Sequence, residues 1–299
     1  MSVDYQNPTP ESVGAFYDEV NTIVAYAQGG SMHYGYWTGP DDDTDFETAG
    51  IRLTDMMIER LAARSGDRVL DVGCGPGGPG VRLAQASGAE LVGISVSEND
   101  VRLANEKARA ADLTDRVRFE PANMLDLPFA DESFDHAMAL ESIVHVTDRV
   151  RALREIARVV RPGGRIVLTD FITHEQAGEK ADDTIVKVYD SWRTAAPVPA
   201  DAYESFAEQA GLVLDEVTDI TDNVKYSGMW TYLALREYAR SNPVPPEVER
   251  ILGVFGPVFN GTADKPALSD EQVVQGWQQL LAKKQVQGMI IVSAHKPQA

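Results

Sequence analysis

The chain has 299 residues, 43% of them apolar, so it can bury one large core or one core with an added lid. No apolar run approaches the roughly 18–20 residues that a membrane-spanning helix requires, which excludes a transmembrane protein. The formal net charge of −19 disfavours nucleic acid and anionic membranes as partners.

The opening segment and the cysteine content bear on location. The segment MSVDYQNPTPES is acidic and polar, and it lacks the basic and apolar regions of a secretory signal. Cys74 is the only cysteine, so no intrachain disulfide can form. Together these features predict a cytoplasmic protein.

The first expected element is a helix over residues 9–27. Pro10 suits the first helical position of this helix, and Glu11 suits its first turn. A glycine- and aromatic-rich loop follows at 28–43, and a second amphipathic helix comes after the loop. We expect residues 1–60 to form a helical lid segment.

From residue 61 to residue 171 the pattern alternates between short apolar strands and helices. The alternation predicts a parallel, doubly wound sheet that forms the core of the chain. The helices are expected at about 79–87, 98–111 and 148–160. The strands are expected at 68–72, 90–95, 117–121, 136–139 and 165–170.

Residues 172–299 are expected to complete the core and to add helices over one edge of the sheet. Two further strands are expected at about 212–220 and 288–294, with helical insertions at about 172–200 and 221–286. The complete prediction is an α/β fold. It has a Rossmann-like, doubly wound sheet of seven mostly parallel strands whose last strand is antiparallel, and it carries a helical lid.

The most informative motif is the run Arg68-Val-Leu-Asp-Val-Gly-Cys-Gly-Pro-Gly-Gly78. It predicts a buried strand that stops at Asp71 and turns through Gly73, Gly75 and Gly77 into a helix. Because glycines leave no Cβ between backbone and ligand, a small cofactor can lie on the main chain at the helix N-terminus. The glycine spacing also fits the dinucleotide fingerprint. The motif alone therefore leaves two cofactors open, a nicotinamide dinucleotide and S-adenosylmethionine.

Polar residues beyond the next two strands bear on this choice. A dinucleotide enzyme places an acidic residue about 20 residues past the glycine loop, and Ser95 stands there instead. Ser95 and Asp100 still offer a hydroxyl and a carboxylate for contacts with a ribose. After the third strand, Asn123 can hydrogen-bond an adenine edge while Met124 packs on the ring. These residues favour S-adenosylmethionine.

Four motifs in order carry a family resemblance. They are Asp71-x-Gly-x-Gly, Asn123-Met124, Phe134-Asp135 and Leu153-Arg-Glu-Ile-Ala-Arg-Val-Val-Arg-Pro-Gly-Gly164. Over about residues 60–171 the chain resembles the class I S-adenosylmethionine-dependent methyltransferases. His33-Tyr-Gly-Tyr-Trp37 resembles bacterial natural-product O-methyltransferases that act on sugars and polyketides, such as the rebeccamycin sugar and rifamycin enzymes. Two departures are Asn123 and Ser95, which stand where members of the family commonly carry acids.

The resemblance implies S-adenosylmethionine as the cofactor and assigns residues to its methionine end. Backbone amides around Gly73–Gly75 and the helix dipole suit the carboxylate. The main chain at Leu140 and Glu141 would face the ammonium group, and Tyr17 would close over the methionine end. No metal site is predicted.

The resemblance also implies a small-molecule acceptor, with O-methylation of a hydroxyl as the favoured reaction. His145 and Asp170 follow the fourth strand and end the fifth, at the sheet edge where ligands bind. Related sugar methyltransferases carry an acid–base pair at the matching positions. Methylation of carbon or nitrogen stays open, as does a cyclase that keeps the cofactor without transferring its methyl group. The residues expected to line the acceptor pocket are His33, Trp37, Trp192 and Trp230.

Overall fold

A computed structural model describes residues 7–27, 30, 32–39, 41–173, 183–260, 269–282 and 288–298. Its centre is an eight-stranded sheet with the order β3-β2-β1-β4-β5-β8-β7, and β6 pairs with β5 beside this path. The five strands from β1 to β5 run parallel, whereas β8 is antiparallel to both β5 and β7. The strands are β1 (Arg68–Val72), β2 (Glu90–Ser95), β3 (Val117–Pro121), β4 (His136–Ala139), β5 (Arg165–Thr173), β6 (Val198–Pro199), β7 (Val213–Asp219) and β8 (Gly288–His295).

The predicted α/β fold is confirmed, including the antiparallel last strand. The difference is β6, a strand of two residues that pairs in parallel with the end of β5. Because two residues ending in Pro199 cannot show an alternating apolar pattern, the sequence gives no signal for this strand. β5 is also longer than expected and extends to Thr173.

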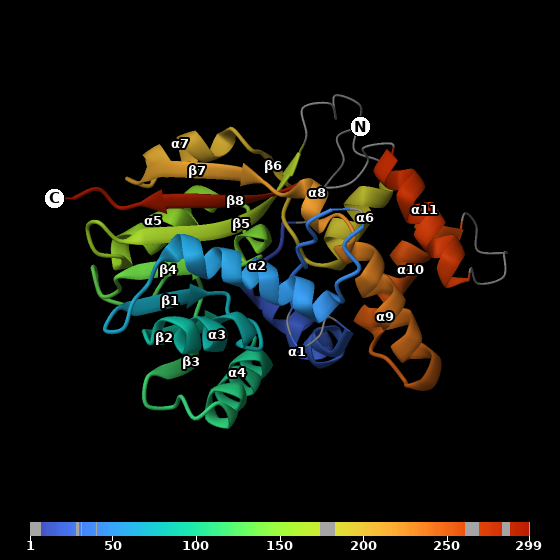
Figure 1. Ribbon diagram of the computed structural model, residues 1–299, viewed down its shortest axis with the longest axis horizontal. Coiled ribbons are helices and arrows are strands. Elements are labelled where there is room, and N and C mark those ends of the chain that lie inside the picture. Colours follow the sequence, from blue (N-terminus) through green and yellow to red (C-terminus); the bar gives the residue numbers. More distant parts are fainter. Residues whose placement is uncertain are drawn as a thin grey trace.

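Helices cover both faces of the sheet and bury its apolar side chains in two clusters. On one face α2 (Phe46–Leu61), α3 (Gly78–Ser87) and α4 (Glu98–Ala110) pack over the strands. On the other face α5 (Arg149–Val159) and α7 (Ala202–Gln209) do so. α2 was expected to belong to the lid, but Leu53, Met57 and Leu61 are fully buried in the first cluster, so this helix lies across the sheet (Figure 1).

The lid consists of α1, α6, α9, α10 and α11, which gather beyond the carboxyl ends of the parallel strands (Figure 1). A third apolar cluster joins these helices, with Phe16 and Val20 from α1 packed among residues of α9, α10 and α11. The bounds are α1 (Pro10–Ala27), α6 (Asp183–Ser191), α9 (Ser227–Ser241), α10 (Pro246–Asn260) and α11 (Asp270–Ala282), with two short helices, η1 (Ile143–His145) and α8 (Thr221–Val224), between sheet and lid.

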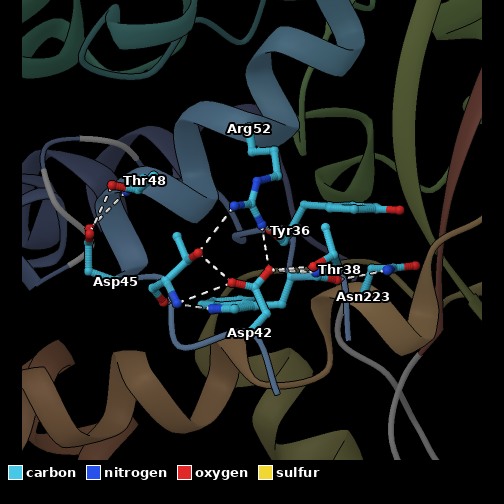
Figure 2. A network of polar contacts seen from close by, with 9 residues as sticks. Tyr36, Thr38, Asp42, Asp45, Thr48, Arg52 and Asn223 are labelled. Carbon is cyan, nitrogen blue, oxygen red and sulfur yellow. Dashed lines mark hydrogen bonds and ion pairs between the residues drawn. The ribbon is translucent and has the colours of Figure 1, made fainter. Parts of the chain in front are cut away.

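A network of polar contacts holds the loop between α1 and α2 against the rest of the molecule (Figure 2). The Asp42 carboxylate accepts hydrogen bonds from the Thr38 amide at 2.7 Å and from the Arg52 guanidinium at 2.6 Å. Trp37 and Asn223 exchange two bonds, in which the Trp37 amide donates to the Asn223 carbonyl and the Asn223 side chain donates to the Trp37 carbonyl. The loop is thereby attached to α2 on one side and to α8 on the other.

Within the described ranges, no helix has both the length and the apolar character needed to cross a membrane. The same residues contain no group of three or more His, Cys, Asp or Glu side chains that could hold a metal ion.

Candidate active site

The loop between β1 and α3 contains three glycines with positive φ, and an added Cβ would meet different surroundings at each of them. A Cβ on Gly73 (φ +74°) would stand 2.2 Å from the Ser142 Cβ. A Cβ on Gly75 (φ +51°) would meet nothing within 4 Å. A Cβ on Gly77 (φ +82°) would stand 2.7 Å from the Ala104 Cβ, so Gly77 serves the packing of α3 against α4. Gly73 and Gly75 line a cavity, whereas Gly77 is absent from its wall.

We predict that two alanine substitutions in this loop have different main effects. Gly73→Ala should mainly lower stability, and Gly75→Ala should mainly lower ligand affinity. Both Gly73→Ala and Gly75→Ala place a side chain at positive φ, which costs about 1–2 kcal/mol. Gly73→Ala adds an overlap with Ser142 that costs a further ~1–3 kcal/mol. Gly75→Ala is expected to fold but to bind S-adenosylhomocysteine weakly, because its methyl group enters the cavity. Urea unfolding and calorimetric titration measure the two effects. Equal stability loss in both variants would contradict this account of the loop.

The cavity beside this loop measures about 840 Å³, including its open mouth. Its wall combines the glycine backbone with a hydroxyl, a carboxylate, a carboxamide and apolar side chains. This set fits S-adenosylmethionine, which presents a carboxylate, ribose hydroxyls and an adenine ring. The residues from the sequence prediction that line it are Tyr17, Gly73, Gly75, Ser95, Asp100, Asn123, Met124, Leu140, Glu141 and His145.

Ser95 and Asp100, the predicted ribose contacts, are hydrogen-bonded to each other. The Ser95 hydroxyl donates to one Asp100 oxygen at 3.0 Å, and the Asn21 carboxamide of α1 donates to the other at 2.8 Å. Burial raises the pKa of the Asp100 carboxyl to about 6. Asn21 is a residue that sequence reasoning missed, because an asparagine on an apolar helix gives no sign of its partner. Through Asn21 the wall of the cofactor cavity is connected to the lid.

Two other predicted cofactor residues, Asn123 and Asp71, lie in surroundings that the sequence did not reveal. The Asn123 side-chain oxygen accepts a hydrogen bond from the Leu125 amide at 3.0 Å, so the side chain also closes its own turn. Asp71 is buried beneath the glycine loop and does not line the cavity. Its Oδ2 atom meets no hydrogen-bond partner among the described residues, and burial raises the pKa of this carboxyl to about 7.

A second cavity of about 610 Å³ adjoins the first and is mainly aromatic and aliphatic. Tyr34 from the loop before α2, Phe171 from β5, and Tyr189 and Trp192 at the end of α6 form much of its wall. The two cavities share four wall residues, which are Tyr17, Met32, Glu141 and His145. Any group passed from one cavity to the other crosses this junction.

His145 presents an unprotonated nitrogen at the junction. Its Nδ1 lies 2.8 Å from the Arg193 carbonyl oxygen, and because a carbonyl only accepts, Nδ1 must carry the proton. Nε2 is therefore unprotonated, and its lone pair accepts a hydrogen bond from the Tyr17 hydroxyl at 2.9 Å. Burial lowers the pKa of the imidazole to about 4. His145 is thus neutral at physiological pH and able to accept a proton at Nε2.

Asp170, the predicted partner of His145, is placed differently. It is fully buried and lines neither cavity. Its Oδ2 accepts from the Arg149 Nε and from the Tyr203 hydroxyl, both at 2.7 Å, and its Oδ1 accepts from the Phe171 amide. The carboxylate is therefore the centre of a buried ion pair below the site. Sequence reasoning could not find Arg149, which starts a helix and carries no motif.

Three of the four residues expected in the acceptor pocket lie elsewhere. His33 is buried, with Nδ1 on the Tyr34 carbonyl and Nε2 on the Thr54 hydroxyl. Trp37 is buried and donates to the Thr44 carbonyl, and Trp230 is 43% exposed outside both cavities. Of the four, Trp192 alone lines the second cavity.

Glu141 stands at the junction in an unusual backbone conformation. Its φ is +50°, and its side chain accepts a hydrogen bond from the Tyr34 amide at 2.7 Å. Burial raises the pKa of the carboxyl to about 8. A carboxyl of this kind is mostly protonated at neutral pH and adds little negative charge to the junction.

A doubly wound sheet with a glycine loop after its first strand and a cavity at its carboxyl edge is the arrangement of proteins that bind a nucleoside-bearing cofactor. Residues 70–168 match the family model described as a methyltransferase domain. The 27-O-demethylrifamycin SV methyltransferase of Amycolatopsis mediterranei is 39% identical over 83% of this chain and 92% of its own length. The methyltransferase GfsG of Streptomyces halstedii is 38% identical over 72% of this chain and 78% of its own. The chain belongs to the S-adenosylmethionine-dependent methyltransferases, and S-adenosylmethionine is its cofactor.

Solved structures agree with the fold. The [4+2]-cyclase SpnF superposes with a TM-score of 0.77 at 26% identity, and the match covers 100% of both chains. A geranyl diphosphate C-methyltransferase from Streptomyces coelicolor superposes with a TM-score of 0.69 at 17% identity, covering 97% of this chain and 99% of its own. This second likeness extends to the fold alone.

Proposed function

We propose that this enzyme transfers the methyl group of S-adenosylmethionine to a hydroxyl of a small-molecule secondary metabolite, with His145 as the base. The observation that carries the proposal is the unprotonated Nε2 of His145, which accepts a hydrogen bond from a hydroxyl at the junction of the two cavities. The relative from A. mediterranei is named as a methyltransferase of a 27-O-demethyl compound, and one from Penicillium expansum is named as an O-methyltransferase. Both names support oxygen as the acceptor atom.

Bound S-adenosylmethionine supplies an electrophilic methyl group on its sulfonium. The chain contributes the surfaces that orient cofactor and acceptor. We assign the methionine carboxylate to the backbone of Gly73 and Gly75, the ribose to Ser95 and Asp100, and the adenine ring to Met124. Leu140, Glu141 and Tyr17 then surround the methionine end, and Asn123 faces the adenine edge.

The contact between Tyr17 and His145 indicates how an acceptor hydroxyl is held. It places a hydroxyl donor 2.9 Å from Nε2, at the point where the aromatic cavity begins. A bound acceptor whose hydroxyl displaces that of Tyr17 gives its proton to Nε2 while its oxygen takes the methyl group, which leaves S-adenosylhomocysteine. Orientation of the two reactants is worth roughly 7–11 kcal/mol and base catalysis ~3–5 kcal/mol, so the cavities contribute more than the base.

The test is methyl transfer from S-adenosylmethionine labelled with deuterium in the methyl group. Hydroxylated polyketides, beginning with 27-O-demethylrifamycin SV, serve as acceptors, and mass spectrometry and NMR locate the label. We expect one S-adenosylhomocysteine per product and the label on oxygen. Label on carbon or nitrogen would contradict the acceptor atom. A converted product without any label would indicate a cyclase, the activity named for the structural neighbour SpnF.

The pH dependence of kcat at saturating S-adenosylmethionine provides a second check, because saturation removes the effect on cofactor affinity of Asp100, whose pKa is about 6. Because burial lowers the pKa of His145 to about 4, protonation should remove the base only when the pH falls through that value. Activity is therefore expected to stay level from pH 7 to about pH 5 and to decrease below it. Circular dichroism at each pH establishes that the protein remains folded. An acidic limb near pH 6.5 would show that the imidazole titrates as it does in water.

A further inference from the structure

The carbonyl that fixes the His145 ring belongs to a turn of unusual composition. At the end of α6 the Arg193 amide donates to the Asp190 carbonyl and the Thr194 amide donates to the Tyr189 carbonyl. These two bonds form a Schellman motif, in which the left-handed position normally holds glycine. Here that position is Arg193, with φ +53°. Unlike glycine, arginine has a side chain that can bind another part of the molecule.

The Arg193 side chain connects the turn to α10 of the lid. Its Nη2 lies 2.9 Å from one oxygen of Glu247, in the first turn of α10. The other Glu247 oxygen lies 2.6 Å from the Nε of Arg250. Arg250 in turn donates to the Asp190 and Ser191 carbonyls at 3.1 and 2.9 Å. Glu247 thus lies between two guanidinium groups. Arg193 is part of the turn, and Arg250 donates hydrogen bonds to carbonyls of the same turn.

A second contact ties the turn to the helix that carries His145. The amide of Ala195 donates to the carbonyl of Val144 at 2.8 Å, one residue before His145. The Arg193 carbonyl is therefore held from two directions, by η1 below and by the Arg193–Glu247–Arg250 bridge above. Without the bridge, the two guanidinium groups would repel each other and the turn would lose its attachment to the lid.

We propose that Glu247 is a positioning residue for His145, resting on the proposed role of His145 as the base. By holding Arg193 and Arg250, it keeps the Arg193 carbonyl on the Nδ1–H of His145. This hydrogen bond keeps the proton on Nδ1 and the lone pair on Nε2, facing the acceptor. The lid and the base are thereby coupled, because displacement of α10 releases the carbonyl that sets the tautomer.

Loss of the Glu247 carboxylate should lower the rate of catalysis more than it lowers stability. The side chains of Arg193, Glu247 and Arg250 are 27%, 21% and 34% exposed, and partly exposed ion pairs of this kind contribute little to stability. Small errors in the position of a reacting group, by contrast, lower the rate strongly. Glu247→Gln is therefore expected to retain the thermal midpoint and the affinity for S-adenosylhomocysteine.

The experiment compares Glu247→Gln with the wild type in two measurements. In ¹⁵N spectra of histidine-labelled protein, the wild-type His145 signal is expected to be that of the Nδ1–H tautomer, and the variant is expected to show a mixture of tautomers. With an acceptor from the labelling screen, kcat is expected to fall about tenfold to 100-fold, with the KM for S-adenosylmethionine unchanged. Glu247→Asp keeps the charge and should recover part of the loss.

Glu237→Gln is the matched control. It removes an exposed carboxylate from a lid helix, where Glu237 pairs with Arg240, and should change neither measurement. An unchanged tautomer and kcat in Glu247→Gln would overturn the proposal, as would a loss of kcat that only follows a loss of folded protein. If His145→Ala itself retained full turnover, the base assignment would fail. An impaired His145→Ala beside an unimpaired Glu247→Gln would refute the positioning role alone.

Discussion

Replacing His145 with alanine is expected to lower kcat by about 10²–10⁴-fold, the range that a positioned base contributes. The substitution removes the imidazole that both cavities share among their described wall residues, and with it the Nε2 lone pair that faces Tyr17. Binding of S-adenosylhomocysteine should change little, because most of the cofactor cavity is formed by other residues. Single-turnover kinetics and calorimetric titration measure the two quantities separately.

Two comparisons make the His145 result interpretable. His145→Gln keeps a side chain able to accept from Tyr17, yet its carboxamide cannot take up a proton at neutral pH, so its turnover should match that of the alanine variant. His295→Ala removes a histidine in a partly exposed pair with Asp215, far from the junction, and should leave turnover unchanged. Full turnover by His145→Ala would refute the base assignment.

Replacing Asp170 with asparagine is expected to lower the free energy of unfolding by about 3–5 kcal/mol. The Arg149 side chain is 3% exposed, and without the carboxylate its guanidinium remains buried beside a neutral carboxamide. Tyr203→Phe is the milder companion, because it removes one hydrogen bond to Asp170 and leaves the ion pair intact. It should cost ~1.5–3 kcal/mol, the range for a bond to a charged group. Urea unfolding of the wild type, Asp170→Asn and Tyr203→Phe measures these free energies.

The same variants distinguish an ion-pair role from a catalytic one. If Asp170 serves Arg149 and Tyr203, Asp170→Asn should lose stability first, and the folded fraction at low temperature should retain turnover. If Asp170→Asn had wild-type stability and failed only in turnover, Asp170 would act as the partner of His145 that the sequence predicted.

The sequence was sufficient for the sheet, the cofactor and the residues around the cofactor cavity. Alternating strands and helices predict a parallel sheet without any knowledge of side-chain contacts. The carboxyl ends of parallel strands share one edge of that sheet. That geometry alone brings Gly73, Ser95, Asn123 and Glu141 to one cavity, although they are far apart in the chain.

The acceptor side could not be predicted to the same depth. An aromatic residue has the same appearance in a sequence whether it packs in a core, lines a cavity or faces solvent. Trp37 and Trp230 were expected in the pocket, yet one packs against Phe46 and Tyr226 and the other is exposed. Phe171 lines the pocket but looks like a strand residue in sequence.

Ion-pair partners between distant segments were equally invisible. Asp170 pairs with Arg149, and Arg193 pairs with Glu247 some 54 positions away, and neither pair belongs to a motif. A charged residue near the end of a strand is as compatible with a buried ion pair as with catalysis. Only the fold decides between them, because it determines which guanidinium reaches the carboxylate.

The central claim is that His145 is a neutral base whose lone pair on Nε2 faces the acceptor cavity. The most direct test is a pH titration of ¹⁵N-histidine-labelled protein, which contains five histidines, with His145→Gln used to assign the signal. We predict the Nδ1–H tautomer at neutral pH and a pKa of about 4. An Nε2–H tautomer, or a pKa near 6.5, would contradict the claim.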